Sequence, residues 1–340
     1  MVNLCDIKSC QGCVVMEKKL SDDRAELLAD VAEQYFIEGK NQAEIAKLVG
    51  VTRSMVSRML TEARRAGIVN IQIRRPMGFD RELQRELEER FNLSAAFVLN
   101  QRNIHSSRIK ERIGKAAAVI LKQYLKPNSQ LGISWGTTVN AVVDAIDPEE
   151  FHETETITIT QLLGALGAKD SNYDAHTVLA SLQRKFRCSA VYLNAPYIVE
   201  NEAIAQSFLK TKNVADGIAN AKKTDVALSS VGSLDISTSS YFLAGYITTE
   251  DVLDMVQAGA VGDVCGFQID EFGNEVCKEF RSRIIGISLE DYLNIPIRIG
   301  VAGGSNKALP LLGCLRGGFL NVVVTDADTA QQLLDLDLIE

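Results

Sequence analysis

The chain has 340 residues, of which 46% are hydrophobic and 24% are charged, and its formal net charge is −8. These values are ordinary for a water-soluble protein, and the length suffices for two or three domains. No apolar run approaches the ~20 residues that span a bilayer, and the N-terminus lacks the basic-then-apolar order of a signal peptide, so we expect a cytoplasmic protein.

Residues 1–20 form an N-terminal extension with three cysteines, Cys5, Cys10 and Cys13, at the spacing C-x4-C-x2-C. That spacing matches three of the four ligands in one iron–sulfur arrangement, but no fourth ligand is evident. We therefore expect a flexible extension with neither a metal nor another cofactor, and keep metal or redox sensing as an alternative. The other cysteines are scattered singly, as small core residues are: Cys188, Cys265, Cys277 and Cys314.

The segment 41–66 carries the signals of two short helices joined by a tight turn. Asn41 and Glu44 have the spacing of a capping box at the start of the first helix. Gly50 allows the turn, and Thr52 is placed to cap the second helix. A supporting helix of about 16 residues precedes them, and all three helices have apolar residues three and four apart. These residues are Ala25, Leu28, Val31, Ala32, Tyr35 and Phe36, then Ile45, Ala46, Leu48 and Val49, then Val56, Met59, Leu60 and Ala63.

Positive charge and hydrogen-bond donors gather around the second helix of this pair. Six arginines and one glutamate lie between Val51 and Arg75, in a chain that is acidic overall. From Val69 to Ile73, alternating apolar and polar residues predict a short strand, the wing of a winged helix-turn-helix. Arginines there can bind DNA phosphates, and side chains near the helix N-terminus can reach base edges; a solvated basic helix in an unrelated bundle is the alternative. The expected DNA-binding residues are Thr52, Arg53, Ser54, Ser57, Arg58, Arg64 and Arg65, with Arg53, Ser54, Ser57 and Arg58 reading bases.

A charged stretch from Phe79 to Asn92 has Leu83, Leu87 and Phe91 at four-residue spacing, which predicts a helix with one apolar face. We expect it to lie in a helical linker of residues 76–93. This linker would join a winged helix-turn-helix domain, residues 21–75, to a second domain of residues 94–340.

In the second domain, strands rich in valine and isoleucine alternate with amphipathic helices. This pattern is typical of an α/β domain whose mostly parallel sheet is covered on both faces. We expect this domain to bind an effector and to form oligomers. The expected strands are 95–99, 130–134, 156–163, 189–193, 226–231, 298–302 and 321–325.

Two glycine-containing turns follow predicted strands, at the end of the sheet where such domains bind small molecules. The first, GISWGTT from Gly132 to Thr138, offers hydroxyls and the free amides of a helix N-terminus to an anion. The second, VAGGSNK from Val301 to Lys307, adds a positive charge. A third stretch, GAVGDVCG, carries Asp263 in an expected glycine-rich loop, where a carboxylate can bind sugar hydroxyls. The expected effector-binding residues are Ser134, Trp135, Gly136, Thr137, Thr138, Asp263, Gly303, Gly304 and Lys307.

Each of these turns also has a purely structural explanation, because strand-to-helix connections use glycine and serine for their geometry. The sequence lacks GxxxxGK[ST], and lacks GxGxxG after a strand, which argues against nucleotide ligands. His105, His152 and His176 lie in no motif with a nucleophile, which leaves Asp263 as the one plausible base. We therefore expect no catalytic residue and no enzyme activity, and keep a phosphosugar isomerase-like enzyme as the alternative.

The order of these motifs resembles the SorC and DeoR group of bacterial sugar-operon regulators over about residues 22–335. The resemblance rests on AEIAKLVGVTRSMVSRMLTEARRAGIVNIQI, GISWGTT, GAVGDVCG with the following DEFGNEV, and GVAGGSNKALPLLGCLRGGFLNVVVTD. It implies a sugar-phosphate-isomerase-like effector domain and a tetrameric repressor or activator. It also implies a phosphorylated sugar against Trp135, Thr137, Thr138, Asp263 and Lys307, with Lys307 on the phosphate.

The chain departs from that group in two places. Some relatives have a lysine after the third strand that can form an imine with an aldehyde sugar, whereas this chain reads TQLLGALG, so we expect no covalent effector complex. The N-terminal cysteines also lie outside the group's pattern. The sequence predicts a DNA-binding transcriptional regulator of a sugar-metabolism operon, with operator DNA, a sugar or sugar-phosphate effector and further copies of itself as partners, and no membrane.

Overall fold

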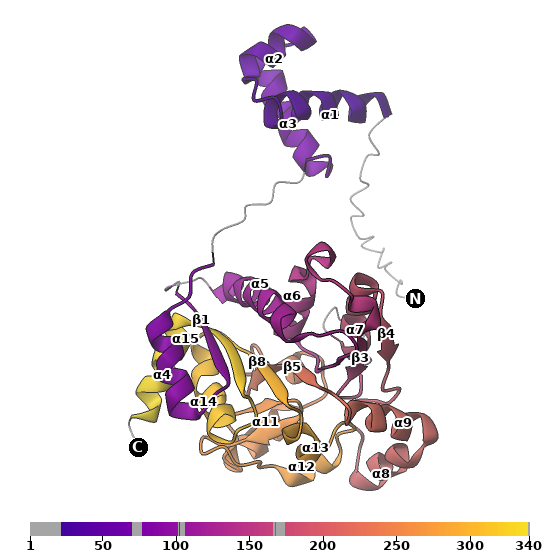
Figure 1. The fold of residues 1–340 in the computed structure, drawn as a ribbon, viewed down its shortest axis with the longest axis vertical. Helices are drawn as coiled ribbons and strands as arrows, with labels where there is room; N and C mark the ends of the chain where they lie inside the picture. The colour runs from indigo at the N-terminus through magenta and orange to yellow at the C-terminus, as the bar shows by residue number, and fades with distance from the viewer. Residues whose placement is uncertain are drawn as a thin grey trace, which may run out of the picture. The chain divides into compact units, whose positions relative to one another are not determined.

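The computed structural model describes residues 22–69, 77–100, 102, 106–165, 167 and 174–338. The chain divides between Pro76 and Met77 into two units, each with a core of its own (Figure 1). Within the described residues, no helix has both the length and the apolar character needed to cross a bilayer. Cys5, Cys10, Cys13 and His105 lie outside this part of the chain.

The described part of the first unit contains α1 (Asp22–Phe36), α2 (Gln42–Val49) and α3 (Arg53–Arg65). Their apolar faces meet in one core, as the three- and four-residue spacing predicts. An ion pair of 2.6 Å between Arg24 and Glu62 also links α1 to α3. Leu48 differs from its prediction, because it is 63% exposed and leaves the core to its neighbours on α2. The buried core residues are Leu28, Val31, Ala32, Ile45, Ala46, Val56, Met59, Leu60 and Ala63.

Both predicted helix starts in this unit are confirmed. Two first-turn amides of α2 donate to the side chain of Asn41, while the Asn41 amide donates to Glu44, which completes the capping box. Gly50 ends α2 in the left-handed conformation, at φ 72°, which glycine adopts without strain. Thr52 Oγ1 accepts a first-turn amide of α3 at 3.3 Å. The predicted wing lies outside the described residues after Val69.

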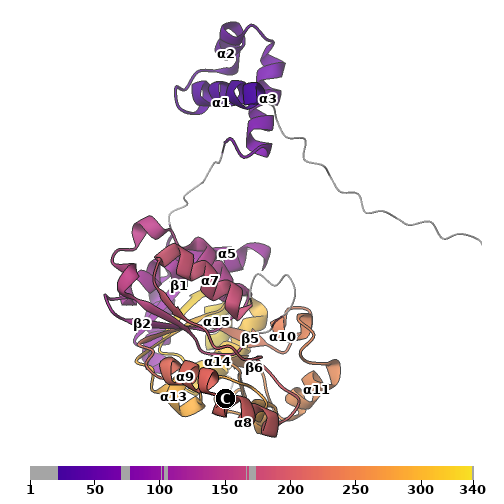
Figure 2. The same ribbon diagram turned by 90° about the vertical axis from the view of Figure 1, so that its right-hand side faces the viewer.

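A parallel sheet forms the centre of the second unit (Figure 2). Its main strands lie in the order β1-β9-β8-β5-β2-β3-β4, and each neighbouring pair is parallel. Residues of β9 enter two cores in alternation, Val323 on one face and Val322 and Val324 on the other. The second face is covered by α5, α6 and α7, and the first by α4, α14 and α15, as predicted for an α/β domain.

The strands are β1 (Ala95–Leu99), β2 (Gln130–Ile133), β3 (Thr158–Gln161), β4 (Ser189–Val191), β5 (Val226–Ser233), β6 (Gly262–Val264), β7 (Phe267–Ile269), β8 (Ile297–Val301) and β9 (Val322–Asp326). The α-helices are α4 (Arg81–Phe91), α5 (Ser106–Tyr124), α6 (Thr137–Ala145), α7 (Ala175–Phe186), α8 (Glu202–Lys210), α9 (Lys212–Ala221), α10 (Ser240–Leu243), α11 (Thr249–Gln257), α12 (Lys278–Ser282), α13 (Leu289–Leu293), α14 (Ala308–Arg316) and α15 (Ala327–Asp337). Short 3-10 helices are η1 (Pro148–Glu150), η2 (Thr154–Thr156) and η3 (Ser305–Lys307).

The stretch GAVGDVCG is a hairpin and not the loop that we expected. β6 pairs antiparallel with the end of β5 and with β7, and Asp263 lies in β6 with 6% of its surface exposed. The turn is formed by Cys265 and Gly266, both at positive φ (50° and 78°), as a two-residue hairpin turn requires. Part of the glycine pattern therefore marks the turn between two short strands.

Helix α4 forms where expected, and its apolar face packs on the second unit. Leu83 and Leu87 are buried in the core of the second unit. The side chain of Gln84 donates to the Ala96 carbonyl at 2.6 Å, and Glu88 accepts the Ala96 amide at 2.8 Å. Ala96 belongs to edge strand β1, so α4 satisfies backbone groups that an open edge would leave unpaired.

Candidate functional site

Helix α3 carries the candidate DNA-binding surface. All seven predicted residues, from Thr52 to Arg65, are exposed. At the start of the helix, the hydroxyls of Thr52 and Ser54 lie 2.9 Å apart, and near its end the Arg64 guanidinium stands 5.4 Å from the centre of the Phe36 ring. The opposite side of α3 is buried in the core, so the basic and hydroxyl-bearing side is the one left for a partner.

The second unit contains a cavity of about 880 Å³ at the carboxyl ends of β2, β5 and β8. From β2 the chain continues through β3 and β4 to one side, whereas β5 pairs on the other side of β2 and continues to β8 and β9. The cavity therefore lies at the point where the strand order reverses, the usual binding position in open α/β sheets.

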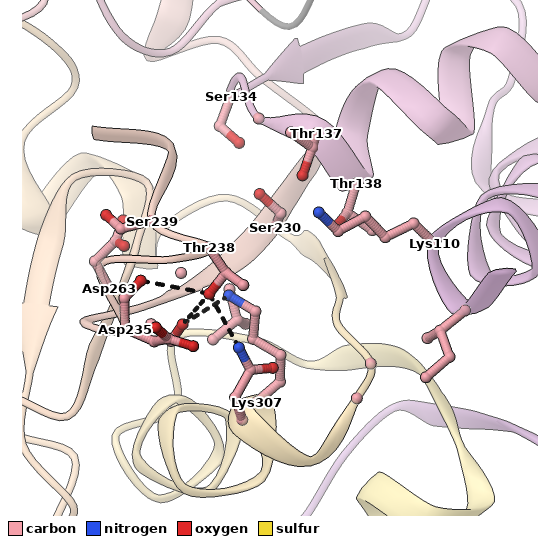
Figure 3. A pocket seen from close by; sticks show the side chains of 18 of the residues that line it. Lys110, Ser134, Thr137, Thr138, Ser230, Asp235, Thr238, Ser239, Asp263 and Lys307 are labelled. Atoms are coloured by element: carbon pink, nitrogen blue, oxygen red, sulfur yellow. Dashed lines mark hydrogen bonds between the residues drawn. The ribbon is translucent and has the colours of Figure 1, made fainter. Parts of the chain in front are cut away.

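One end of the cavity is the N-terminus of α6. Gly136 precedes the helix with φ 139°, a backbone conformation that favours glycine, and a Cβ there would lie 2.8 Å from Ser230 Oγ and would displace that side chain. The helix has no side-chain cap, and its first turn carries the hydroxyls of Thr137 and Thr138. Lys110 extends from α5 toward these threonines and Ser230 (Figure 3). This end combines free amides, hydroxyls and a positive charge.

The other end holds Asp263 and Lys307. Tyr241 donates a 2.5 Å hydrogen bond to Asp263, and Lys307 Nζ donates to Ser233 Oγ at 3.3 Å. Burial raises the pKa of Asp263 to about 6, against the opposing effects of the Tyr241 hydrogen bond and the Lys307 charge. Burial likewise lowers the pKa of Lys307 to about 8, against the attraction of Asp263. Asp263 and Lys307 are thus both charged between about pH 6 and pH 8.

Gly232 explains how the carboxylate of Asp263 is seated. The two residues are paired across β5 and β6, and a Cβ on Gly232 would lie 1.8 Å from Asp263 Oδ1. Any larger residue at this position would displace the carboxylate. Three features therefore fix the position of Asp263: the pairing of β6 with β5, the hydrogen bond from Tyr241 of α10 and the charge of Lys307.

The turn at Gly303 and Gly304 differs from the anion cradle that we expected. The Gly304 amide already donates to Asp326 Oδ2 at 3.0 Å and to Thr329 Oγ1 at 2.8 Å. Asp326 and Asp328 also line the cavity on this side. A phosphate placed here would meet an engaged amide and two carboxylates, so this turn is a poorer anion site than the start of α6.

An aromatic group forms the inner wall. Trp135 makes edge contacts with Tyr197 and Tyr241, at centroid distances of 5.0 Å, and the two tyrosine rings stack at 5.2 Å. The buried Ser134 Oγ and Trp135 Nε1 make no hydrogen bond to a protein group, so both can serve a ligand or water. Leu163 and Cys265 complete the apolar part of this wall.

The structure brings all nine expected effector-binding residues to this one cavity. Within the described residues, no histidine lines it, and His176 instead packs its ring against Tyr192. Sequence reasoning missed several polar lining residues, because they lie on helix α5, on strand β5, in the connection from β5 to α10 or on α10, without a recognisable motif. They include Lys110, Ser230, Asp235, Thr238, Ser239 and Tyr241.

Comparison with known families finds two matches. Residues 75–335 match the family described as "Putative sugar-binding domain". Residues 42–69 match "Bacterial regulatory proteins, crp family". The first match covers the whole cavity, and the second covers α2 and α3.

Individual proteins are similar over most of the chain. "Transcriptional regulator LsrR" of Enterobacter sp. (strain 638) is 29% identical, covering 92% of this chain and 93% of that protein. The "Sorbitol operon regulator" of Klebsiella pneumoniae is 25% identical, covering 92% of this chain and 99% of that protein. A solved DeoR family transcriptional regulator from Listeria monocytogenes has a TM-score of 0.68 at 28% identity, covering 74% of this chain and 98% of that chain. The chain therefore belongs to the SorC and DeoR group of bacterial transcriptional regulators with a sugar-binding domain.

Proposed function

We propose that this protein is a cytoplasmic, sequence-specific regulator of a sugar-metabolism operon, and that a phosphorylated sugar in the cavity controls its affinity for operator DNA. The observation that carries the proposal is the polarity of the cavity. An uncapped helix N-terminus and Lys110 stand at one end, and Asp263 with Lys307 stands at the other. A sugar phosphate has matching ends, one anionic and one rich in hydroxyls.

The phosphate is best placed at the start of α6. Free amides at a helix N-terminus attract anions, and the hydroxyls of Thr137 and Thr138 add donors. Lys110 supplies a full charge, whereas Asp235, Asp263, Asp326 and Asp328 line the other parts of the cavity and repel an anion. This placement revises our expectation that Lys307 holds the phosphate.

The sugar hydroxyls are best placed between Asp263 and Lys307. An ionised carboxylate accepts hydrogen bonds and an ammonium donates them, so the pair can orient a hydroxyl or a carbonyl oxygen. Tyr241 donates to Oδ2 of Asp263, so the orientation of the carboxylate is set before a ligand binds. Trp135 lies alongside as an apolar wall for the face of the sugar.

A thermal-shift screen of sugar phosphates beside their unphosphorylated forms tests the ligand class. A ligand that binds only the folded state raises the unfolding temperature, and we expect the phosphorylated member of an active pair to raise it more. Equal shifts for both members would contradict a phosphate subsite.

Replacing Lys110 tests the position of the phosphate. Lys110→Met should weaken binding of the active sugar phosphate by about tenfold, about 1.4 kcal/mol, and should weaken binding of its unphosphorylated form much less. Lys115→Met is the matched control, because Lys115 lies on the same helix but pairs with Glu111 on the surface. If Lys307→Met removes the preference for phosphate and Lys110→Met does not, the phosphate lies at Lys307 instead.

The proposed binding to operator DNA is tested with the DNA region upstream of the protein's own coding sequence. The purified full-length protein should retard this DNA at low salt, and the active sugar phosphate should change the affinity. Helix-turn-helix proteins bind paired half-sites, which requires at least two copies, and the resemblance to the SorC and DeoR group implies four, so we also propose a homotetramer of the 37.2 kDa chain. Sedimentation velocity measures its mass, and a monomer or a dimer at micromolar concentration would contradict that state.

One observation favours the alternative that this protein is an enzyme. Asp263 is buried and its pKa is raised to about 6, which are properties of a general base. We nevertheless propose no catalytic activity, because the named relatives are transcriptional regulators and no histidine is among the described lining residues of the cavity. Conversion of ribose or hexose phosphates, followed by NMR and abolished in Asp263→Asn, would reverse this conclusion.

A further inference from the structure

Helix α14 joins the effector cavity to a charged cluster on the far side of the second unit. It starts immediately after Lys307 and ends at Arg316. The helix packs closely on the β6–β7 hairpin. A Cβ on Gly262 would lie 2.6 Å from the side chain of Pro310, and a Cβ on Gly313 would lie 2.3 Å from the Asp270 carbonyl oxygen. Because these contacts leave no free space, a displacement of the hairpin or of Lys307 presses directly on α14.

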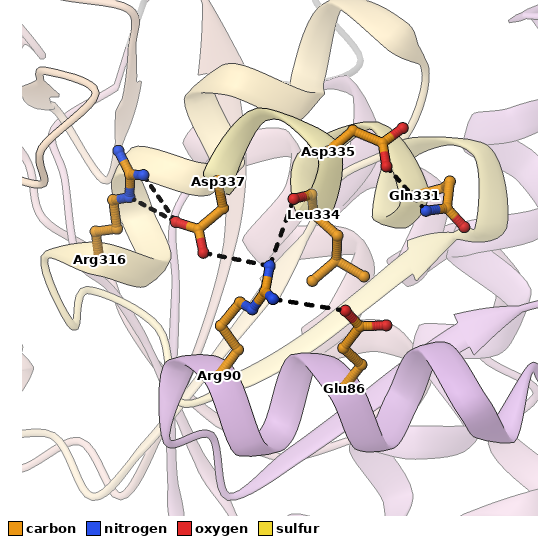
Figure 4. A network of polar contacts seen from close by, with 7 residues as sticks. All are labelled: Glu86, Arg90, Arg316, Gln331, Leu334, Asp335 and Asp337. Atoms are coloured by element: carbon orange, nitrogen blue, oxygen red, sulfur yellow. Dashed lines mark hydrogen bonds and ion pairs between the residues drawn. The ribbon is translucent and has the colours of Figure 1, made fainter. Parts of the chain in front are cut away.

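The charged cluster connects three helices through one carboxylate. Arg316 of α14 donates to Asp337 Oδ1 of α15 through Nε at 3.0 Å and through a terminal nitrogen at 2.7 Å. The other oxygen of Asp337 forms an ion pair at 3.5 Å with Arg90 of α4. Figure 4 shows Asp337 between the two guanidinium groups. The side chains of Arg316, Asp337 and Arg90 are only 15%, 18% and 29% exposed, so solvent screens this cluster less than it screens ordinary surface pairs.

Helix α4 is the first helix after the segment that leads from the DNA-binding unit. Residues just before it already belong to the second unit, because the Asp80 amide donates to the Val98 carbonyl and the Asn100 amide donates to the Gly78 carbonyl. Leu83 and Leu87 hold the middle of α4, and Arg90 ties its end to α15 through Asp337 and, at 3.5 Å, the Leu334 carbonyl. A shift of α15 or α14 therefore reaches the chain at Met77.

We propose that the cluster of Arg316, Asp337 and Arg90 couples the effector cavity to DNA binding, by passing a displacement of α14 through α15 to α4. This inference rests on the proposed function. A ligand between the two ends of the cavity pulls on Lys307 and on β6, and α14 begins at the first and packs on the second. Asp337 makes the link between helices, because it pairs with guanidinium groups from two different helices, whereas the other carboxylate at Arg90, Glu86 at 3.8 Å, lies on α4 itself.

The coupling can be measured without knowing the natural sugar. Trp135 is the only tryptophan in the chain and lines the cavity, so its fluorescence reports occupancy directly. We would titrate the full-length protein with a sugar phosphate that raises its unfolding temperature in the screen above (below, the phosphate), because this ligand reaches both ends of the cavity. The titration is done in the absence and in the presence of a saturating DNA duplex selected in vitro with the same protein. The ratio of the two dissociation constants is the coupling, because linkage between two sites is reciprocal.

The informative variant is Asp337→Asn, and Asp335→Asn is its matched control. Asp335 lies on the same helix but contacts only Gln331 among the residues drawn in Figure 4. In the wild type and in Asp335→Asn, DNA should change the phosphate dissociation constant by about fivefold or more, the low end of ordinary coupling. In Asp337→Asn the ratio should fall to within about twofold of one, while phosphate affinity without DNA stays within about twofold of the wild type.

Arg316→Lys provides a second variant if Asp337→Asn folds poorly. It keeps the charge but loses the two-nitrogen contact, so coupling should fall in the same way. A wild-type ratio in both variants overturns the proposal, and so does an equal loss in Asp335→Asn. A wild-type protein whose Trp135 fluorescence and DNA affinity both ignore every sugar phosphate of the screen contradicts the proposed function itself, and the coupling proposal then fails with it.

Discussion

The DNA-binding unit and the effector-binding unit hold their functional residues in opposite ways. In the first, the seven candidate residues lie within or next to one helix and are all exposed. In the second, the candidates come from separate segments between Ser134 and Lys307 and meet in a cavity where Trp135 and Asp263 are each 6% exposed. A surface on one helix depends on local sequence, whereas a cavity depends on which strands become neighbours.

The largest effect is expected from a substitution that unfolds the first unit and leaves the second unit folded. Val56 is fully buried in the core of the first unit, and Val56→Asp would place an unpaired carboxylate there. DNA affinity, measured by fluorescence anisotropy, should fall more than about 100-fold because the first unit unfolds. Phosphate binding reported by Trp135 should stay within about twofold, since Val56 lies in a separate core.

Val256→Asp is the control for this substitution, because Val256 is 53% exposed on α11. It should leave both activities close to the wild type. If Val56→Asp also abolished the phosphate response, the two units would unfold as one, and the comparison between an independent surface and an independent cavity would be wrong.

The same contrast between local and long-range contacts explains which features could be predicted from the sequence. The caps at Asn41 and Thr52 were predictable because each depends on residues two or three positions away. The use of the Gly304 amide was not predictable, because its acceptors are Asp326 and Thr329, more than 20 positions later in the chain. The sequence shows the two glycines, but the use of the Gly304 amide depends on the pairing of β8 with β9, which brings Asp326 close to it.

Asp263 and Lys110 show two other limits. Asp263 is a candidate in the sequence, but its glycine-rich surroundings predict a loop, whereas Cys265 and Gly266 form a hairpin turn and Gly262 begins strand β6. Lys110 was missed because it sits in an ordinary amphipathic helix, and only the packing of α5 brings it to the cavity. Pairing between segments such as β5 and β6 is the information that the local pattern lacks.

A smaller effect is expected at the DNA-reading surface. Arg58 is exposed on α3, and losing a base contact costs about 1–3 kcal/mol, so Arg58→Ala should weaken binding to the selected duplex by about tenfold or more. It should also relax the preference at one position of the site and leave phosphate binding unchanged. Competition with single-base variants of the duplex measures this preference.

Arg184→Ala, which removes an exposed arginine from α7, controls for the change in net charge. It should leave DNA affinity within about twofold of the wild type, because one distant surface charge is largely screened. If Arg58→Ala weakened all duplexes equally, Arg58 would be a phosphate contact and the reading face would have to be reassigned.

The pH dependence of effector binding should be smaller still. Asp263 and Lys307 are both charged only between their pKa values of about 6 and about 8. Calorimetry with the active sugar phosphate should therefore show highest affinity near pH 7 and weaker binding on both sides. The ligand's own second ionisation, near pH 6, adds to the acidic side. Asp263→Asn separates the two causes, because the acidic loss that persists in this variant belongs to the ligand.

The smallest expected effect is on the stability of the second unit, and its sign follows from burial. The pKa of Asp263 is raised in the folded state, so the carboxyl stabilises the fold most when protonated, and this contribution is lost as pH rises from about 4 through about 6. Replacing Asp263 by asparagine removes this loss. The unfolding temperature of Asp263→Asn relative to the wild type should therefore rise by a few degrees between pH 4 and pH 7.

Asp235 lines the same cavity, but its pKa is shifted in the opposite direction from that of Asp263. Hydrogen bonds from Ser237 lower the pKa of Asp235, so its ionised form favours the folded state, and this contribution is lost as pH falls through its folded pKa. Asp235→Asn should therefore lose stability relative to the wild type as pH rises, the reverse of Asp263→Asn. Because Asp235 is exposed, solvent screens its interactions and the slope should be shallower. Parallel slopes for the two variants in thermal scans would mean that burial does not distinguish these carboxylates. Exposed Asp235 and buried Asp263 would then respond to pH in the same way, and the difference between exposed and buried residues would not hold within the cavity.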